Sequence, residues 1–386
     1  MKPYITFIFL LLFGIASAQK PYKIRGNIKG IEEGTVVSLY EQEGDELRLI
    51  KQDTTKAGLF LFEGIVSKPT EYAIMAKGAG FPSSWLEVWV APNALINITG
   101  TNKLLKTWTV KSNVKEQLQL NLFTDASKSD IDEEQKLFVT RNEIMLNRDN
   151  LTTDQKKVTR QRLDSIDRAI DSIDSLISKR NLTLLEKMPI SQVWMNKLRD
   201  IASMDYYYKK EGTRELIIPL YNKLTKPQKE SELGREIQTY LYPPKVVKAG
   251  DRIADTKLYD LQGKTHSLSD FKGKYILLDF WSIGCYPCLN SLPELKKLSE
   301  KYADSLTIVS LSMDKKKETW ANASKEKKIN WVNLSDQLGH TGIASKYGVN
   351  GIPHFVLISP DGIIKESWVG YSDNSLEPKV KKYLKQ

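Results

Sequence analysis

Apolar and polar residues alternate with a period of two in the first part of the chain, after an apolar N-terminal run. The alternation is clearest over residues 22–28, 35–40 and 87–90. Glycines and a proline interrupt it at the intervals that separate short strands. The pattern predicts a small β-rich domain, an antiparallel sandwich or barrel, over residues 19–112.

Residues 113–245 show a helical period instead. One stripe of apolar residues, spaced by three and four, lies opposite a row of Asp and Ser. The stripe consists of Leu163, Ile166, Ile170, Ile173 and Ile177. It predicts an amphipathic helix that forms one side of a helical hairpin. A coiled-coil dimer seam is the alternative, but the stripe covers only about two heptads, fewer than such a seam needs, so packing within the chain is favoured.

Strands and helices alternate after Pro243 and Pro244, which break the helical segment. Residues 289–302 have helical spacing, and several apolar or β-branched runs have the length of strands. The expected strands are residues 275–281, 306–312, 354–358 and 362–369. This order predicts an α/β domain over residues 246–386, with a mixed sheet and helices on both faces.

The first 18 residues have the pattern of a secretion signal. Residues 5–15 are nearly all apolar, a run too short to span a bilayer comfortably, and Ala16, Ser17 and Ala18 supply the small residues that a signal peptidase needs. We expect cleavage of this signal peptide after Ala18 and export to the periplasm or cell envelope. An uncleaved N-terminal membrane anchor is the alternative. Later apolar runs have only strand length, so we expect no stable transmembrane segment after cleavage.

Composition excludes several classes of protein. The 386 residues are 41% hydrophobic and 27% charged, which argues against wholesale disorder and against a polytopic membrane protein. The 57 basic residues exceed the 47 acidic ones by 10, but the excess is spread along the chain without a basic motif, so we expect no binding to nucleic acid. Two cysteines are too few for a disulfide-stapled miniprotein or a four-cysteine zinc site.

Cys285 and Cys288 form a C-x-x-C motif between a buried strand and a helix, which is a redox signature. Unpaired N–H groups and the helix dipole stabilise a thiolate at a helix N-terminus. We therefore expect Cys285 to be the exposed nucleophile and Cys288, one turn into the helix, to be the resolving thiol. Pro287 suits the first turn, because its missing N–H costs no helical hydrogen bond there.

An inert disulfide and half of a metal site are the alternatives for this motif. The histidines of the chain are His266, His340 and His354, and none has ligand spacing to the cysteine pair. The strand–turn–helix context favours redox chemistry. We expect the protein to use no metal and no organic cofactor.

Three blocks of sequence around the motif resemble thioredoxin and, within that superfamily, the TlpA-like periplasmic thiol–disulfide oxidoreductases, which are related to the alkyl hydroperoxide reductase and thiol-specific antioxidant proteins. The blocks are residues 263–274, residues 278–281 with the C-x-P-C that follows, and residues 347–353. The resemblance implies a thioredoxin-like fold for residues 246–386. Residues 22–64 are similar, with weaker motifs, to a β-rich domain of unknown function that precedes the redox domain in many exported proteins of Gram-negative envelopes.

The resemblance also implies roles for single residues. Pro353 resembles the cis-proline that faces the disulfide and leaves Ile352 able to pair with a bound peptide backbone. Asp279 resembles the buried acid that assists deprotonation of the resolving cysteine, Cys288. Apolar neighbours surround Asp279 in the sequence, and burial should raise the pKa of its carboxyl.

Residues beside the cysteines and the proline are expected to contact the substrate. They are Trp281, Tyr286, Pro287 and Ile352. The sequence departs from the family at Gly284, where Trp is usual, and at Ser291, where some relatives carry Glu. The nearest carboxylate downstream is Glu294, which we expect on the helix surface. His354 follows the proline and is expected to point away from the site in a packing role.

These features together indicate an exported thiol–disulfide oxidoreductase in which Cys285 attacks a substrate disulfide and Cys288 resolves the mixed disulfide. The resemblance favours a reductant, with exported cysteine-containing proteins such as apocytochromes c as substrates and a membrane thiol donor that re-reduces the enzyme. A peroxiredoxin-like peroxidase is one alternative, because Ser282 lies three residues before Cys285, although Leu278 stands where such enzymes have proline. An envelope binding or scaffold protein with a secondary redox domain is another.

Overall fold

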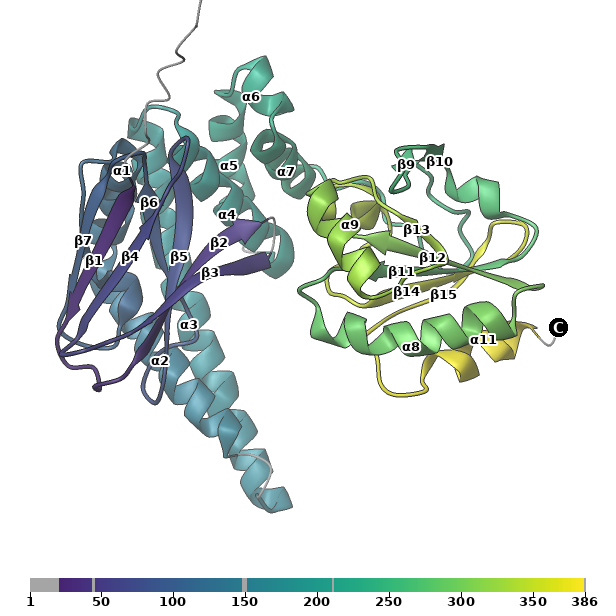
Figure 1. Ribbon diagram of the computed structural model, residues 1–386, viewed down its shortest axis with the longest axis horizontal. Coiled ribbons are helices and arrows are strands. Elements are labelled where there is room, and N and C mark those ends of the chain that lie inside the picture. The colour runs from purple at the N-terminus through teal and green to yellow at the C-terminus, as the bar shows by residue number, and fades with distance from the viewer. Residues whose placement is uncertain (1–20, 44–45, 148–150, 210–211, 385–386) are drawn as a thin grey trace, which may run out of the picture.

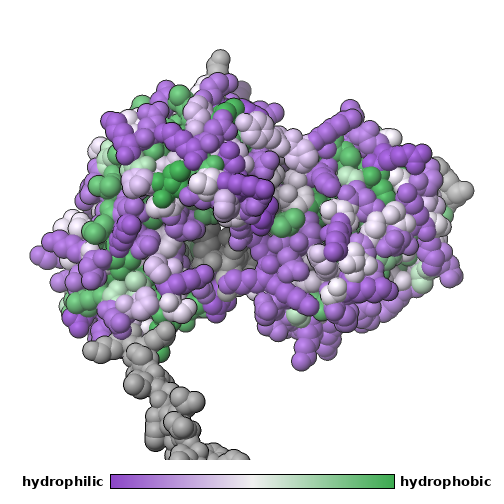
Figure 2. All heavy atoms as spheres, turned by 90° about the horizontal axis from the view of Figure 1, so that it is seen from above, coloured by the Kyte–Doolittle hydropathy of each residue, from purple (hydrophilic) through white to green (hydrophobic). Residues whose placement is uncertain are grey.

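The computed structural model describes residues 21–43, 46–147, 151–209 and 212–384 (Figure 1). The expected signal peptide, residues 1–18, lies outside the described residues. Two bodies lie side by side: residues 21–242, here called the N-terminal unit, and residues 246–384, here called the C-terminal domain. Within the described ranges, no helix is both long enough and apolar enough to cross a membrane. Polar residues cover most of the face drawn in Figure 2, and apolar residues form small separate patches on it.

Two sheets form the first part of the N-terminal unit, which confirms the expected β-rich sandwich. One sheet has the strand order β4 (Leu59–Gly64), β1 (Tyr22–Ile28), β7 (Leu95–Gly100), β8 (Thr109–Lys111). The other has the order β3 (Glu46–Thr54), β2 (Val36–Glu43), β5 (Thr70–Lys77), β6 (Leu86–Val90). The expected antiparallel arrangement is wrong for one pair, because β1 and β7 are parallel. Between β1 and β7 the chain forms the strands of the second sheet, and this provides the long connection that a parallel pair requires.

Helices follow the sandwich, as expected. They are α1 (Lys115–Ala126), α2 (Lys128–Leu146), α3 (Thr153–Lys187), α4 (Gln192–Tyr208), α5 (Thr213–Asn222), α6 (Lys226–Glu230) and α7 (Glu232–Leu241). Figure 1 shows α2 and α3 as a hairpin that projects beyond the sandwich. Ile166 and Ile170 of the apolar stripe are buried, and Arg141 of α2 pairs with Asp167 of α3 at 2.7 Å. The stripe therefore packs within the chain.

The sandwich and the helices share one hydrophobic core. A single cluster includes Ile24 of β1 together with Trp194 and Leu198 of α4, and none of these three side chains has exposed surface. Asn196 of α4 also donates a hydrogen bond of 2.7 Å to the carboxylate of Glu71 on β5. Residues 21–112 and the helices after them thus pack as one body, although their sequence patterns are different.

A five-stranded mixed sheet forms the centre of the C-terminal domain. Its order is β13 (Val332–Leu334), β12 (Leu306–Ser312), β11 (Tyr275–Trp281), β14 (His354–Ile358), β15 (Ile364–Val369). The strands β11, β12 and β13 are parallel, whereas β14 is antiparallel to β11 and to β15. This confirms the mixed sheet expected from the sequence.

Both faces of this sheet are covered. Leu277 of β11 lies in a cluster with α8 (Tyr286–Lys301) and α11 (Leu376–Leu384), and α9 (Lys317–Glu326) packs on the same face through Trp320. Leu278 and Phe280 face the opposite cluster. That cluster contains residues of β9 (Leu258–Tyr259), the 3-10 helix η2 (Leu268–Phe271) and α10 (Ile343–Lys346). The alternation along β11 therefore assigns its odd-numbered residues to the face that carries α8.

Candidate active site

The C-x-P-C segment lies where β11 ends and α8 begins, as the sequence predicted. After Trp281 the chain turns: the N–H of Cys285 donates to the carbonyl of Ser282 at 3.2 Å, and the N–H of Gly284 donates to the Ser282 hydroxyl, also at 3.2 Å. This turn places Cys285 at the N-cap of α8, where its Sγ accepts the N–H of Cys288 at 3.1 Å. A sulfur at this position lies among the unpaired N–H groups of the helix terminus, which favour its anionic form.

Cys285 and Cys288 form a disulfide, with their Cα atoms 5.2 Å apart. The two sulfurs differ in access. The side chain of Cys288 is 0% exposed, whereas Cys285 is half-buried at the end of the helix. An incoming thiolate or disulfide therefore reaches Cys285 first, which agrees with the order expected for nucleophile and resolving thiol.

Asp279 lies in β11 on the α8 face of the sheet and is 0% exposed. Its Oδ2 accepts a hydrogen bond of 2.8 Å from the hydroxyl of Ser310, and that hydroxyl accepts the indole N–H of Trp331 at 2.9 Å. The other carboxyl oxygen has no hydrogen-bond partner among the described residues. Burial raises the pKa of Asp279 to about 7, and the Ser310 hydrogen bond opposes this shift. The burial of Asp279 and its raised pKa agree with what the sequence predicted. Proton transfer between Asp279 and Cys288 stays a prediction.

Pro353 follows a cis peptide bond from Ile352, as the resemblance implied. Ile352 and Cys285 both pack, partly buried, against the cluster that contains Trp281 and Cys288. Because His354 pairs with Phe280 across β14 and β11, the proline lies beside the end of β11. The structure therefore brings the cis-proline segment and the cysteine pair together.

Trp281 is placed differently from the expectation. Its side chain is 0% exposed, packs with Trp320 and Cys288, and donates a 3.4 Å hydrogen bond to Asn333. The prediction that it contacts the substrate is wrong for this side chain, because the alternation of β11 turns it into the core beneath α8. Tyr286, which is 73% exposed, and Pro287 lie at the surface beside Cys285, where a substrate can contact them.

Glu294 is buried, so the expectation of a surface position is wrong. Its Oε1 accepts the N–H groups of Leu376 and Glu377 at 3.0 and 2.9 Å, and it thereby satisfies donors at the start of α11. Ser291 is also buried and bonds through its hydroxyl to the carbonyl of Cys288 at 2.8 Å. It is a structural group of α8 in this chain.

His354 has the packing role that the sequence predicted. It is 5% exposed, and its Nε2 lies 2.7 Å from the hydroxyl of Ser367. Its ring contacts the ring of Phe280 edge-on. Burial lowers the pKa of His354 to about 4, so the imidazole is neutral at physiological pH. Among the residues that the structure describes, no group of three or more His, Cys, Asp and Glu side chains is arranged to hold a metal ion.

Sequence reasoning missed the polar network beneath the site. Ser310 and Trp331 connect to Asp279, and Asn333 accepts hydrogen bonds from Trp281 and from Trp320, the latter at 3.2 Å. One signal was present in the sequence: Ser310 interrupts the apolar run of β12 at a position whose neighbours are all buried. A polar residue in such a run needs a hydrogen-bond partner, and the carboxyl on the adjacent strand was available.

Comparison with known proteins agrees with this site. Residues 273–364 match a family described as thioredoxin-like. The thioredoxin-like protein YneN of Bacillus subtilis is 30% identical over 138 residues, which are 34% of this chain and 78% of that protein. The thiol-disulfide oxidoreductase ResA of Bacillus thuringiensis subsp. konkukian is 31% identical over 147 residues, 38% of this chain and 84% of ResA.

One solved structure is similar to part of this chain. It is the thioredoxin domain of a thiol-disulfide oxidoreductase from Bacteroides vulgatus, which is 32% identical to this chain. The match covers 36% of this chain and 99% of that domain, with a TM-score of 0.34. The family match contains both cysteines, Asp279 and Pro353. The chain belongs to the thioredoxin-like thiol–disulfide oxidoreductases.

Proposed function

We propose that this protein is an exported reductant that transfers two electrons to disulfides of other exported proteins, with apocytochromes c among its substrates. The observation that carries the proposal is the arrangement of a half-buried Cys285 at the helix terminus over a fully buried Cys288 and a buried Asp279. In a dithiol of this kind only Cys285 can reach a substrate disulfide, and Cys288 is held in place for the intramolecular step that follows.

The reaction begins with both cysteines reduced. The Cys285 thiolate attacks one sulfur of the substrate disulfide, and the other substrate sulfur leaves as a thiolate with the bonding electron pair. The Cys288 thiolate then attacks Cys285, which forms the enzyme disulfide and releases the second substrate thiolate. Both departing thiolates take up protons, the substrate gains two electrons, and the enzyme finishes in the disulfide state found in the structure.

Asp279 supplies a proton acceptor for the second step. A thiol buried as completely as Cys288 resists ionisation, because burial penalises its charged form. A carboxyl with a pKa of about 7 is close to half-ionised at neutral pH, so it can take the Cys288 proton and later return it. This role is an inference from burial and pKa, supported by the family resemblance of Asp279.

Export and re-reduction complete the proposal. The N-terminal pattern of residues 1–18 predicts a cleaved signal peptide, and a disulfide such as that of Cys285 and Cys288 persists in an oxidising compartment. Each turnover consumes two electrons, so a reductant must restore the dithiol, and in this proposal a thiol donor at the membrane supplies them. The curated relative ResA is named a thiol-disulfide oxidoreductase, which supports the same chemistry for this chain.

The reduction potential of the Cys285–Cys288 pair tests the direction of electron flow. The mature protein is equilibrated in glutathione or dithiothreitol buffers, trapped with a thiol alkylator, and read by its mass shift. A potential near or below about −230 mV supports a reductant, whereas about −120 to −180 mV contradicts it and indicates an oxidase or isomerase. Turnover of hydrogen peroxide, measured on the same sample, tests the peroxidase alternative.

A further inference from the structure

The carboxyl ends of β11 and β12 lie at one edge of the sheet in the C-terminal domain. The two strands are parallel, so the loops that follow them leave the sheet at the same edge. The N–H of Met313, just after β12, donates to the carbonyl of Trp281 at the end of β11 at 2.8 Å. The cysteine loop therefore has residues 313–316, which lead into α9, as its neighbour.

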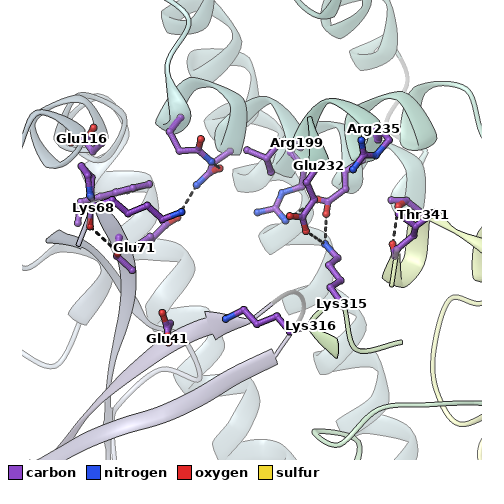
Figure 3. A pocket seen from close by; sticks show the side chains of 18 of the residues that line it. Glu41, Lys68, Glu71, Glu116, Arg199, Glu232, Arg235, Lys315, Lys316 and Thr341 are labelled. Carbon is purple, nitrogen blue, oxygen red and sulfur yellow. Dashed lines mark hydrogen bonds and ion pairs between the residues drawn. The ribbon is translucent and has the colours of Figure 1, made fainter. Parts of the chain in front are cut away.

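The N-terminal unit contacts the same edge. Lys315 lies 3.0 Å from the carboxylate of Glu232 and also pairs with Glu236, both on α7. Arg199 of α4 lies 3.4 Å from the second oxygen of Glu236. Figure 3 shows Lys315 reaching from the C-terminal domain toward Glu232. We call these four residues the Lys315 cluster.

The Lys315 cluster is shielded from solvent at its centre. The side chain of Glu236 is 5% exposed and that of Lys315 is 16% exposed. A pair that is this well shielded is weakened less by salt than a surface pair, and removal of one partner leaves a buried charge behind. The cluster therefore holds α7 against the edge of the sheet that carries the cysteines.

A cavity of about 710 Å³ lies beside the Lys315 cluster, between the two bodies (Figure 3). Its volume is within the range of sites that bind ligands. The lining comes from both bodies and combines polar and charged side chains with apolar ones such as Trp89 and Leu233. It includes Lys68 and Thr70 of the sandwich, Gln192 and Asn196 of α4, and Lys316 and Gln337 of the C-terminal domain. Amide, hydroxyl and ammonium groups together can satisfy both the N–H and the C=O groups of a peptide backbone.

The cavity and Cys285 lie at the same edge of the sheet, so one substrate can contact both. Sheet order places β12 and β13 on one side of β11 and the cis-proline strand β14 on the other. The N-terminal unit covers the loops after β12 and β13, whereas Tyr286 beside the reactive sulfur remains 73% exposed. A low-molecular-weight disulfide has only a few residues or atoms beyond its sulfurs. A polypeptide continues in both directions from its cysteine, and Lys315 and Lys316, which follow β12 beside the cysteine loop, line the cavity.

We infer that the cavity binds the polypeptide that flanks the target disulfide, and that Lys315 is the positioning residue that joins the cavity and the cysteine edge into one docking surface. The N-terminal unit thereby gives the enzyme its preference for polypeptide disulfides over low-molecular-weight ones. This inference rests on the proposed function and adds the site at which the substrate chain is recognised.

Charge reversal at Lys315 tests the positioning role. The reduced full-length protein is mixed with a synthetic peptide that contains one disulfide, or with oxidised glutathione, and the second-order rate constant is read by quenching with an alkylator. We expect Lys315→Glu to lower the rate with the peptide about tenfold or more and the rate with glutathione by less than about twofold. Lys317→Glu, the same charge change at an exposed position outside the cavity, is the matched control and should alter neither rate.

A second variant tests the cavity without touching the Lys315 cluster. Lys68→Trp fills the cavity from the sandwich side, and Lys77→Trp adds the same bulk at the other end of β5, outside the cavity. We expect Lys68→Trp alone to slow the peptide about tenfold and to leave glutathione unchanged. The inference would be overturned if a variant lost the same fraction of its rate with both substrates. It would also be overturned if either Lys68→Trp or Lys315→Glu reduced the peptide at the wild-type rate. A wild-type protein that reduces neither substrate would instead overturn the proposed function, and the inference with it.

Discussion

Replacement of Asp279 by asparagine removes a titratable group from the core of the C-terminal domain and keeps its shape, including an oxygen that can accept the Ser310 hydroxyl. The wild-type carboxyl has a pKa of about 7 in the folded protein, against an ordinary value of 3.8, because burial penalises its charged form. The folded protein therefore binds this proton more tightly than the unfolded chain does. Wild-type stability must fall as pH rises between these two values, and the Asp279→Asn variant lacks that loss.

The size of the effect follows from the two pKa values of Asp279. Each pH unit between them costs the wild-type protein about 1.4 kcal/mol relative to the variant. From 3.8 to about 7, the cost reaches about 4 kcal/mol. A typical domain is stable by roughly 5 to 15 kcal/mol, so the change is large. We expect Asp279→Asn to exceed the wild type in unfolding free energy by about 4 kcal/mol at pH 8 and to be nearly equal to it at about pH 4.

Urea unfolding of the oxidised protein across this pH range measures the difference. Pulsed hydrogen exchange of peptides from β11 and β12, read by mass spectrometry, reports the C-terminal domain separately from the N-terminal unit. Asp304→Asn is the control, because it makes the same change of side chain at an exposed position in the turn between α8 and β12. A difference between Asp279→Asn and wild type that stays constant from about pH 4 to about pH 8 would refute the reasoning from burial.

Three further predictions concern the cysteines, the start of α11 and the buried histidine. Cys285→Ser should abolish disulfide reduction, whereas Cys288→Ser should accumulate a mixed disulfide that adds the substrate's mass to the protein. Glu294→Ala should lower the free energy of unfolding by about 2 kcal/mol, measured in urea, because two N–H groups of α11 lose their acceptor; an unchanged midpoint would contradict this capping role. Because burial lowers the pKa of His354 to about 4, the wild type should lose about 2 kcal/mol relative to His354→Gln as pH falls from about 6.5 to about 4; parallel curves in acid would contradict this.

The cysteine site could be located from the sequence because its determinants are local. A buried strand, a turn and a helix start lie within a few residues of one another, and their spacing alone places Cys285 at the helix terminus. The burial of Asp279 also followed from its apolar neighbours in the same strand. The cis peptide before Pro353 came from the family resemblance, because the local sequence carries no signal for it.

The remaining features depend on partners that are distant in the sequence. Glu294 accepts hydrogen bonds from Leu376, 82 residues later, and no helical periodicity reveals such a contact. Trp281 was misplaced because a strand that is buried on both faces shows no alternation, so its sequence does not tell which face each residue meets. The parallel pairing of β1 with β7 likewise depends on a crossover between sheets, which residue patterns within single strands do not record.

The shared core of the N-terminal unit determines the order in which the chain can fold as it is synthesised or translocated. Glu71 of the sandwich pairs with Asn196, which lies 125 residues later in the chain. Glu87 pairs with Lys197, which lies 110 residues later. Neither contact can form until α4 has emerged. Until α4 has emerged, part of the apolar surface of the early strands lacks the side chains of α4 that cover it in the folded unit, and exposed apolar surface of this kind favours aggregation. The cysteines emerge later still, so a folded N-terminal unit can be in place before Cys285 and Cys288 first meet an oxidant.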